Sequence, residues 1–137
     1  MQSLACQLGV EELIRWYPDC TDDEMLEMYQ QCDLFILANR QVGSDVEGFG
    51  MVLLEAAACG KPTIAGRSGG TREAIVDGQT GCLVDADDSN AIANQVVELL
   101  NNAENRTRLG NAGRLRAESN FDWPILASKV ERELGLA

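Results

Sequence analysis

Short apolar runs alternate along the chain with longer segments in which apolar and polar residues recur at helical spacing. Strands of a parallel sheet are buried on both faces and read as near-continuous hydrophobic runs, which predicts four short strands. They cover residues 13–17, 34–38, 62–65 and 81–84. The other segments predict helices over residues 3–9, 22–32, 51–59, 71–76, 90–101, 103–118 and 123–136. Strands that alternate with helices predict an α/β fold with a parallel sheet and crossover helices.

Several polar residues mark where these helices begin and end. Thr21 is followed three residues later by Glu24, which predicts a capping box at the start of the second helix. Ser89 is the expected cap of the helix that begins at residue 90, and Gly60 is expected to stop the helix over residues 51–59. These signals support the predicted helix boundaries independently of the apolar pattern.

Composition narrows the function. The chain has 137 residues, one domain's worth, and 45% of them are hydrophobic, enough for a core. The formal net charge is −11, which argues against nucleic acid or an anionic membrane surface as a direct partner. The chain has no histidine. This excludes acid–base catalysis and metal binding by histidine.

Five cysteines are spread widely, and no two form a CxxC pair. A zinc site therefore has little support, and no metal is expected. Their apolar neighbours predict buried, reduced thiols, which fits a reducing cytoplasm. No apolar stretch approaches the roughly 20 residues that span a bilayer, and the first ten residues lack the features of a signal peptide.

The stretch EGFGMVLLEAAACG, residues 47–60, carries the chemistry. Glu47 is expected in a loop at the carboxyl end of the strand over 34–38, and Glu55 one turn into a helix that starts near Gly50. In open α/β sheets ligands bind outside the strand carboxyl ends, and a helix N-terminus suits a phosphate. Carboxylates accept hydrogen bonds from sugar hydroxyls instead. Acids on both sides of a phosphate cradle predict a nucleotide sugar as ligand.

The string EGFGMVLLE resembles the E-x7-E motif of retaining glycosyltransferases of the GT-B fold, especially glycosyltransferase family 4. The resemblance continues in DEMLEMYQQCDLFILANR before the motif, and in AAACGKPTIAGRSGGTREAIVDGQTGCLV and FDWPILASKV after it. It covers nearly all of residues 1–137 and implies a single α/β domain: part of the Rossmann-like C-terminal domain of such an enzyme. The string DVEGFGMVLLEAAACGKP also resembles bacterial mannosyltransferases that use GDP-mannose.

The resemblance implies a role for each matching residue. Glu47 would contact the donor hexose at the catalytic centre, and Glu55 would accept hydrogen bonds from the ribose hydroxyls. The remaining implied contacts are backbone N–H groups of Gly48, Phe49 and Gly50 near the diphosphate, packing by Met51, Val52 and Leu53 beside the nucleotide, and Tyr17 in the loop against the base. The implied donor is a GDP-, UDP- or ADP-sugar, with no cofactor.

Simpler readings of the same residues stay open. Glu47 and Glu55 could be ordinary surface acids, and Phe49 could be a core residue. Arg40 could steady a phosphate or pair with an acid. Arg67 and Arg72 read as surface charges.

The sequence also departs from the family pattern. By the resemblance, we expect the acceptor domain of such enzymes to be missing from these residues, together with the part that carries the family's Arg and Lys for the diphosphate. Arg15 is the only basic residue before Arg40. We therefore expect the chain alone to be inactive in hexosyl transfer, and we expect a missing domain or self-association to cover an open sheet edge. The alternative is a non-catalytic module of this fold that binds a nucleotide or a partner chain.

Overall fold

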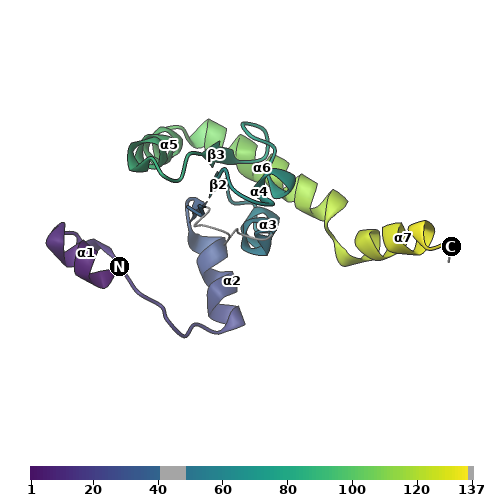
Figure 1. Cartoon of the computed structure of the whole chain (residues 1–137), viewed down its shortest axis with the longest axis horizontal. Coiled ribbons are helices and arrows are strands. Elements are labelled where there is room, and N and C mark those ends of the chain that lie inside the picture. The colour runs from purple at the N-terminus through teal and green to yellow at the C-terminus, as the bar shows by residue number, and fades with distance from the viewer. Residues whose placement is uncertain (41–48, 136–137) are drawn as a thin grey trace.

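Three parallel strands and the helices around them form the body of the protein in a computed structural model that describes residues 1–40 and 49–135 (Figure 1). The strands are β1 (Phe35–Leu37), β2 (Thr63–Gly66) and β3 (Cys82–Val84). The helices are α1 (Gln2–Gln7), the 3-10 helix η1 (Glu11–Leu13), α2 (Asp22–Gln31), α3 (Met51–Ala58), α4 (Thr71–Ala74), α5 (Ser89–Asn101), α6 (Ala103–Asn120) and α7 (Trp123–Glu133).

The sheet has the order β1-β2-β3, and both neighbouring pairs run parallel. Ile36 lies opposite Ile64, and Ile64 lies opposite Cys82. Parallel neighbours need a crossover connection, and the stretches that contain α3 and α4 supply the two crossovers. The predicted parallel α/β fold is confirmed, with three strands among the described residues.

Alternate residues of the strands build two cores, one on each face of the sheet. On one face Ala65 and Leu83 pack with Leu53 of α3 and with Ala74 and Ile75 at the end of α4. On the other face the buried residues come from β2, β3, α5 and α6: Ile64, Cys82, Val84, Leu99 and Leu109. Helix α3 packs on the first face through Leu53 and also lies against α6.

The predicted strand over residues 13–17 is wrong. Glu11–Leu13 forms η1 instead, and residues 14–17 lie outside the sheet although Ile14 has extended backbone angles, φ −113° and ψ 128°. An extended segment becomes a strand only when a neighbouring strand pairs with its backbone groups. Figure 1 shows α1 and this segment set apart from the three strands, so the described residues bring no such neighbour beside it.

Most of the predicted helix signals are confirmed, and one predicted cap is corrected. Thr21 and Glu24 form the predicted capping box: the Thr21 N–H donates to Glu24 at 2.8 Å, and the Glu24 N–H donates to Thr21 Oγ1 at 3.3 Å. The predicted cap Ser89 is wrong, because the Asp88 carboxylate accepts from the N–H groups of Asn90 and Ala91.

The prediction of buried thiols is right for Cys82 only, since Cys6 is exposed and the other three cysteines are half-buried.

Helix α6 approaches the rest of the body very closely. A Cβ atom on Gly110 would overlap the carbonyl oxygen of Gly60, and one on Gly113 would lie 3.0 Å from the carbonyl oxygen of Thr80. The two glycines face the turns that follow α3 and precede β3. They let α6 lie directly against the backbone of these turns.

Candidate functional site

Helix α3 begins at the carboxyl end of the sheet, as the sequence predicts. Its cap is Gly50, whose φ of 75° and ψ of 52° lie in the left-handed region. A Cβ atom at Gly50 would also come within 3.0 Å of the Leu53 side chain. No side chain caps this helix start. The Leu53 N–H donates to the Gly50 carbonyl oxygen at 2.9 Å. The N–H groups of Met51 and Val52 have no carbonyl four residues earlier within the helix, as at any helix N-terminus.

Glu55 lies one turn into α3 with an exposed side chain. The hydroxyl of Tyr29, on α2, donates a hydrogen bond of 3.0 Å to Glu55 Oε2. Burial and this acceptor raise the pKa of Tyr29, so the phenol stays protonated and remains a donor. Glu55 is thus an accessible acid whose orientation is set by a second helix.

The Glu55 side chain borders two hollows. The first, of about 500 Å³, lies between α3, α6 and α7, and we call it the aromatic hollow. Phe49, Met51, Phe121 and Trp123 line it with Glu55, and the rings of Phe49 and Phe121 lie 5.4 Å apart. Its lining is mainly apolar, with aromatic faces suited to a planar ring.

The second hollow, of about 460 Å³, lies between α2 and α3, and we call it the α2–α3 hollow. Asp22, Met25, Tyr29 and Cys59 line it together with Glu55. It offers apolar side chains beside carboxylates and one phenol hydroxyl. The two hollows share Glu55 and Ala58, and Glu55 is the charged residue of the two. Apolar walls around a few convergent polar groups are typical of small-molecule sites.

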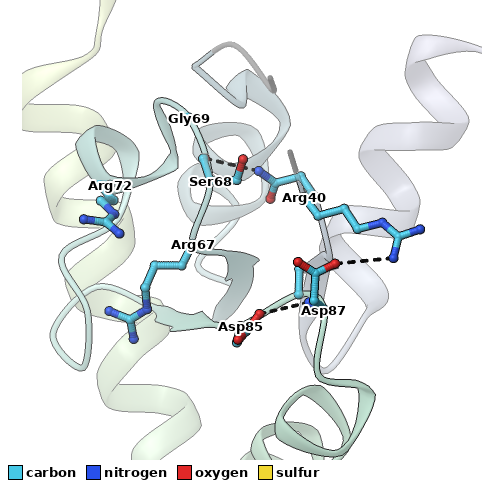
Figure 2. Close-up of a pocket in the computed structure, with 9 residues that line it drawn as sticks. Arg40, Arg67, Ser68, Gly69, Arg72, Asp85 and Asp87 are labelled. Carbon is cyan, nitrogen blue, oxygen red and sulfur yellow. Dashed lines mark hydrogen bonds and ion pairs between the residues drawn. The ribbon is translucent and has the colours of Figure 1, made fainter. Parts of the chain in front are cut away.

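A third hollow, of about 680 Å³, lies at the carboxyl ends of the three strands, and we call it the carboxyl-edge hollow (Figure 2). Arg40, Arg67 and Arg72 line it, and Figure 2 shows the Arg40 side chain pointing to the opposite side from those of Arg67 and Arg72. Arg40 pairs loosely with Asp87 at 3.4 Å. Arg67 pairs with Asp77 at 2.9 Å and also donates to the Leu83 carbonyl oxygen at 2.7 Å. Two of the three charges are therefore already matched by acids.

Asn39, which lines this hollow, connects the ends of two strands. Its Oδ1 accepts from the Gly66 N–H at 3.1 Å, and its Nδ2 donates to the Ser68 carbonyl oxygen at 3.3 Å. The Thr71 hydroxyl lies 2.8 Å from both the Gly66 and the Ser68 carbonyl oxygens. A Cβ atom on Gly66 would overlap the Asn39 backbone. The end of β1 and the loop after β2 are thus joined by side-chain hydrogen bonds.

The structure brings only some of the predicted site residues together. Glu47 and Gly48 lie outside the described residues. Phe49, Met51 and Glu55 line the aromatic hollow, whereas Arg40 lies in the carboxyl-edge hollow. Tyr17 is 57% exposed and lines neither hollow beside Glu55.

Within α3, Val52 is half-buried, and Leu53 is 1% exposed. The Leu53 side chain packs in the core and is not available to a ligand. Two structural residues escaped the sequence analysis: Tyr29, which reads as an ordinary residue of an amphipathic helix, and Asn39, which follows a strand. Within residues 1–40 and 49–135, no cluster of three acids or cysteines could hold a metal ion, and no helix is both long and apolar enough to cross a membrane.

Comparison with known proteins identifies the class. The sequence profile of the family described as "Glycosyl transferases group 1" matches residues 1–116. With the parallel sheet, the helix start at Gly50 and the acid one turn later, this match places the chain in that family, and its solved structural neighbours are glycosyltransferases of the GT-B fold.

Individual relatives agree with this assignment. The chain is 40% identical over 132 residues to a GDP-mannose-dependent α-(1-6)-phosphatidylinositol monomannoside mannosyltransferase of Mycolicibacterium smegmatis, covering 95% of this chain and 35% of the relative. It is 35% identical to a D-inositol 3-phosphate glycosyltransferase of Thermomonospora curvata, covering 95% and 29%. Anabaena HepE, solved in complex with UDP, shares the fold at a TM-score of 0.87 with 23% identity, covering 99% and 36%. The chain spans about a third of the length of these proteins.

Proposed function

We propose that the chain is the donor-binding part of a retaining glycosyltransferase of family 4, in which Glu55 accepts hydrogen bonds from the ribose hydroxyls of a nucleotide sugar. The observation that carries this proposal is the position of Glu55: exposed, one turn beyond Gly50, and shared by two hollows. An acid there accepts from a diol, while the α3 N-terminus provides N–H groups for a diphosphate.

The proposed donor is GDP-mannose, and the transferred group a hexose. Support comes from the relative that is 40% identical, whose name states that it depends on GDP-mannose. Glu47 is the proposed contact to the hexose, because it precedes Gly50 by three residues in the chain. The acceptor stays unassigned.

Binding of nucleotides tests the proposal directly. Calorimetric titration of the 137-residue chain with GDP, UDP and ADP should show binding, with GDP preferred. Glu55→Ala should weaken the binding about tenfold or more, because hydrogen bonds to a charged group contribute about 1.5–3 kcal/mol. The matched control is Glu98→Ala, an exposed acid on α5 that lines none of the three hollows, and it should change nothing.

Failure would be visible in two ways. Binding that survives Glu55→Ala unchanged would remove Glu55 from the site. If the chain bound none of the three nucleotides, the donor-binding role would be rejected in favour of a module that binds a partner chain.

We also propose that hexosyl transfer needs residues beyond this chain, including a second domain that binds the acceptor. The proposed location of the reaction is the cytoplasm. At the strand ends, Arg40 and Arg67 are paired with acids, and Arg40 points to the opposite side from Arg67 and Arg72, so the three do not converge on one diphosphate. Electrostatic stabilisation of a leaving diphosphate is usually the largest catalytic contribution in such transfers. The 137-residue chain should therefore form no mannosylated product from GDP-mannose, and detection of such a product by mass spectrometry would contradict this.

A further inference from the structure

Tyr29 lies on α2, 26 residues before Glu55 in the sequence, yet its hydroxyl meets the Glu55 carboxylate. Both residues line the α2–α3 hollow. Among the described residues, Tyr29 is the one that donates a hydrogen bond to the Glu55 carboxylate. The Tyr29 hydroxyl therefore restricts the orientation of the acid on which the proposed donor site depends.

The tyrosine itself is held firmly. Its side chain is 8% exposed, and its ring packs edge-on against Phe35 of β1 with 5.4 Å between the ring centroids. An aromatic side chain has only two rotatable bonds, so packing against the sheet fixes the position of its hydroxyl. Tyr29 thus connects β1, through its ring contact with Phe35, to the Glu55 carboxylate, through its hydroxyl.

A glutamate on an exposed helix face has three rotatable bonds, and fixing them for a ligand costs conformational entropy. The Tyr29 hydrogen bond removes part of this freedom before any ligand arrives. It occupies one oxygen, Oε2, and a carboxylate has about four acceptor positions in total. Oε1 therefore keeps its capacity to accept from a ligand hydroxyl.

We infer that Tyr29 is a positioning residue, which presents the Glu55 carboxylate in the orientation that accepts the ribose hydroxyls of the donor nucleotide. The inference rests on the proposed function and adds to it a second residue and a way of acting. A purely structural role is the competing account, in which the hydrogen bond only joins α2 to α3. The two accounts differ in whether the effect of Tyr29 depends on the ribose hydroxyls.

The test uses Tyr29→Phe, which removes the hydroxyl and keeps the ring against Phe35. The probes are GDP and UDP, each paired with its 2′,3′-dideoxy counterpart, titrated calorimetrically into the 137-residue chain. The wild-type chain should bind the ribose forms more tightly than the dideoxy forms. Tyr29→Phe should weaken binding of the ribose form about three- to tenfold and leave binding of the dideoxy form unchanged.

Two further variants sharpen the result. In a Glu55→Gln background, Tyr29→Phe should weaken binding far less than it does alone, because two residues that act through one hydrogen bond are not additive. Gln95→Ala is the control, because it removes a side-chain hydrogen bond of 3.2 Å, from Gln95 to Glu98 on α5, that lies outside both hollows that contain Glu55. It should change neither affinity.

The outcomes separate the inference from the function on which it rests. If Tyr29→Phe weakened binding of the ribose and dideoxy forms equally, or weakened neither, the positioning role would be overturned. The proposed function would still be supported if the wild-type chain bound the ribose form more tightly than the dideoxy form. A wild-type chain that binds both forms equally, or neither, would overturn both.

Discussion

Leu53 and Met51 show how differently two neighbouring apolar residues of one helix can be used. Leu53 is 1% exposed in the core beneath the sheet, whereas Met51 is 58% exposed at the aromatic hollow. The pattern of apolar residues in MVLLEAAA does not separate them, because the helix is apolar on most of its surface. The sheet and α6, which both pack against this helix, determine which side is buried.

This contrast predicts different costs of truncation. Leu53→Ala should lower the free energy of unfolding by about 2–5 kcal/mol, since it opens a cavity in a packed core. Met51→Ala should change it by less than about 0.5 kcal/mol. Urea unfolding of both variants measures the difference, and similar costs for the two would contradict the burial seen here.

Cys82 gives stability a dependence on pH. Burial raises the pKa of its thiol to about 11, whereas an unfolded cysteine ionises near about 8.5. The neutral buried thiol thus contributes stability that is fully present below pH ~8.5 and is lost as the pH rises towards 11. Urea midpoints measured between pH 8 and pH 10.5 should fall, and they should fall less steeply for Cys82→Ala. Equal slopes for the two proteins would argue against this role of Cys82.

At the scale of elements, the close approach of α6 depends on a glycine. Gly110 lies against the Gly60 carbonyl with no space for a Cβ atom. Alanine is the better helix former by about 1 kcal/mol, so a helix in isolation would gain from the substitution. In the folded protein the added methyl group would have to push α6 away from the turn after α3.

Gly110→Ala should therefore destabilise the protein despite the gain in helix propensity, by about 1–3 kcal/mol. Asn111→Ala, at an exposed position of the same helix, should be neutral or stabilising. Thermal unfolding of the two variants compares them. An increase in Tm for Gly110→Ala would show that α6 does not lie this close.

The elements also show how far sequence reasoning reaches. Local signals were sufficient for the capping box at Thr21 and for the positions of β1, β2 and β3. The expected burial on both faces is wrong for β1, where Ile36 is 38% exposed. Local signals failed for residues 13–17, because an apolar run forms a strand only where a neighbouring strand pairs with its backbone groups. The site divides in the same way: the position of Glu55 follows from its spacing to Gly50, while its contact with Tyr29 joins helices that the sequence does not place side by side.

At the scale of the whole molecule, the N-terminal helix is weakly attached. Helix α1 packs mainly against η1, and Figure 1 shows both separated from the sheet by an extended segment. Leu8 and Leu13 are 65% and 83% exposed. The free edge of β1 is also unpaired within the described residues. Exposed apolar side chains and an open edge are features that proteins normally cover.

Arg15 makes this arrangement testable, since it is the only basic residue before Arg40 and lies in the extended segment. Limited trypsin digestion should cut first after Arg15, because exposed segments without regular structure are the preferred sites of cleavage. Mass spectrometry identifies the product, and Arg15→Gln should remove it. Survival of this bond until the helices of the body are digested would contradict the arrangement.

The hydrogen bonds of Asn39 have a mechanical consequence. Because its amide holds the Gly66 N–H and the Ser68 carbonyl at once, the end of β1 cannot shift without displacing the loop before α4. Arg40 follows Asn39 at the end of β1, Arg67 lies in the loop before α4, and Arg72 lies in α4 itself. A force on any of these three arginines is therefore shared by both segments. A shift of the end of β1 is therefore expected to move the loop before α4 with it.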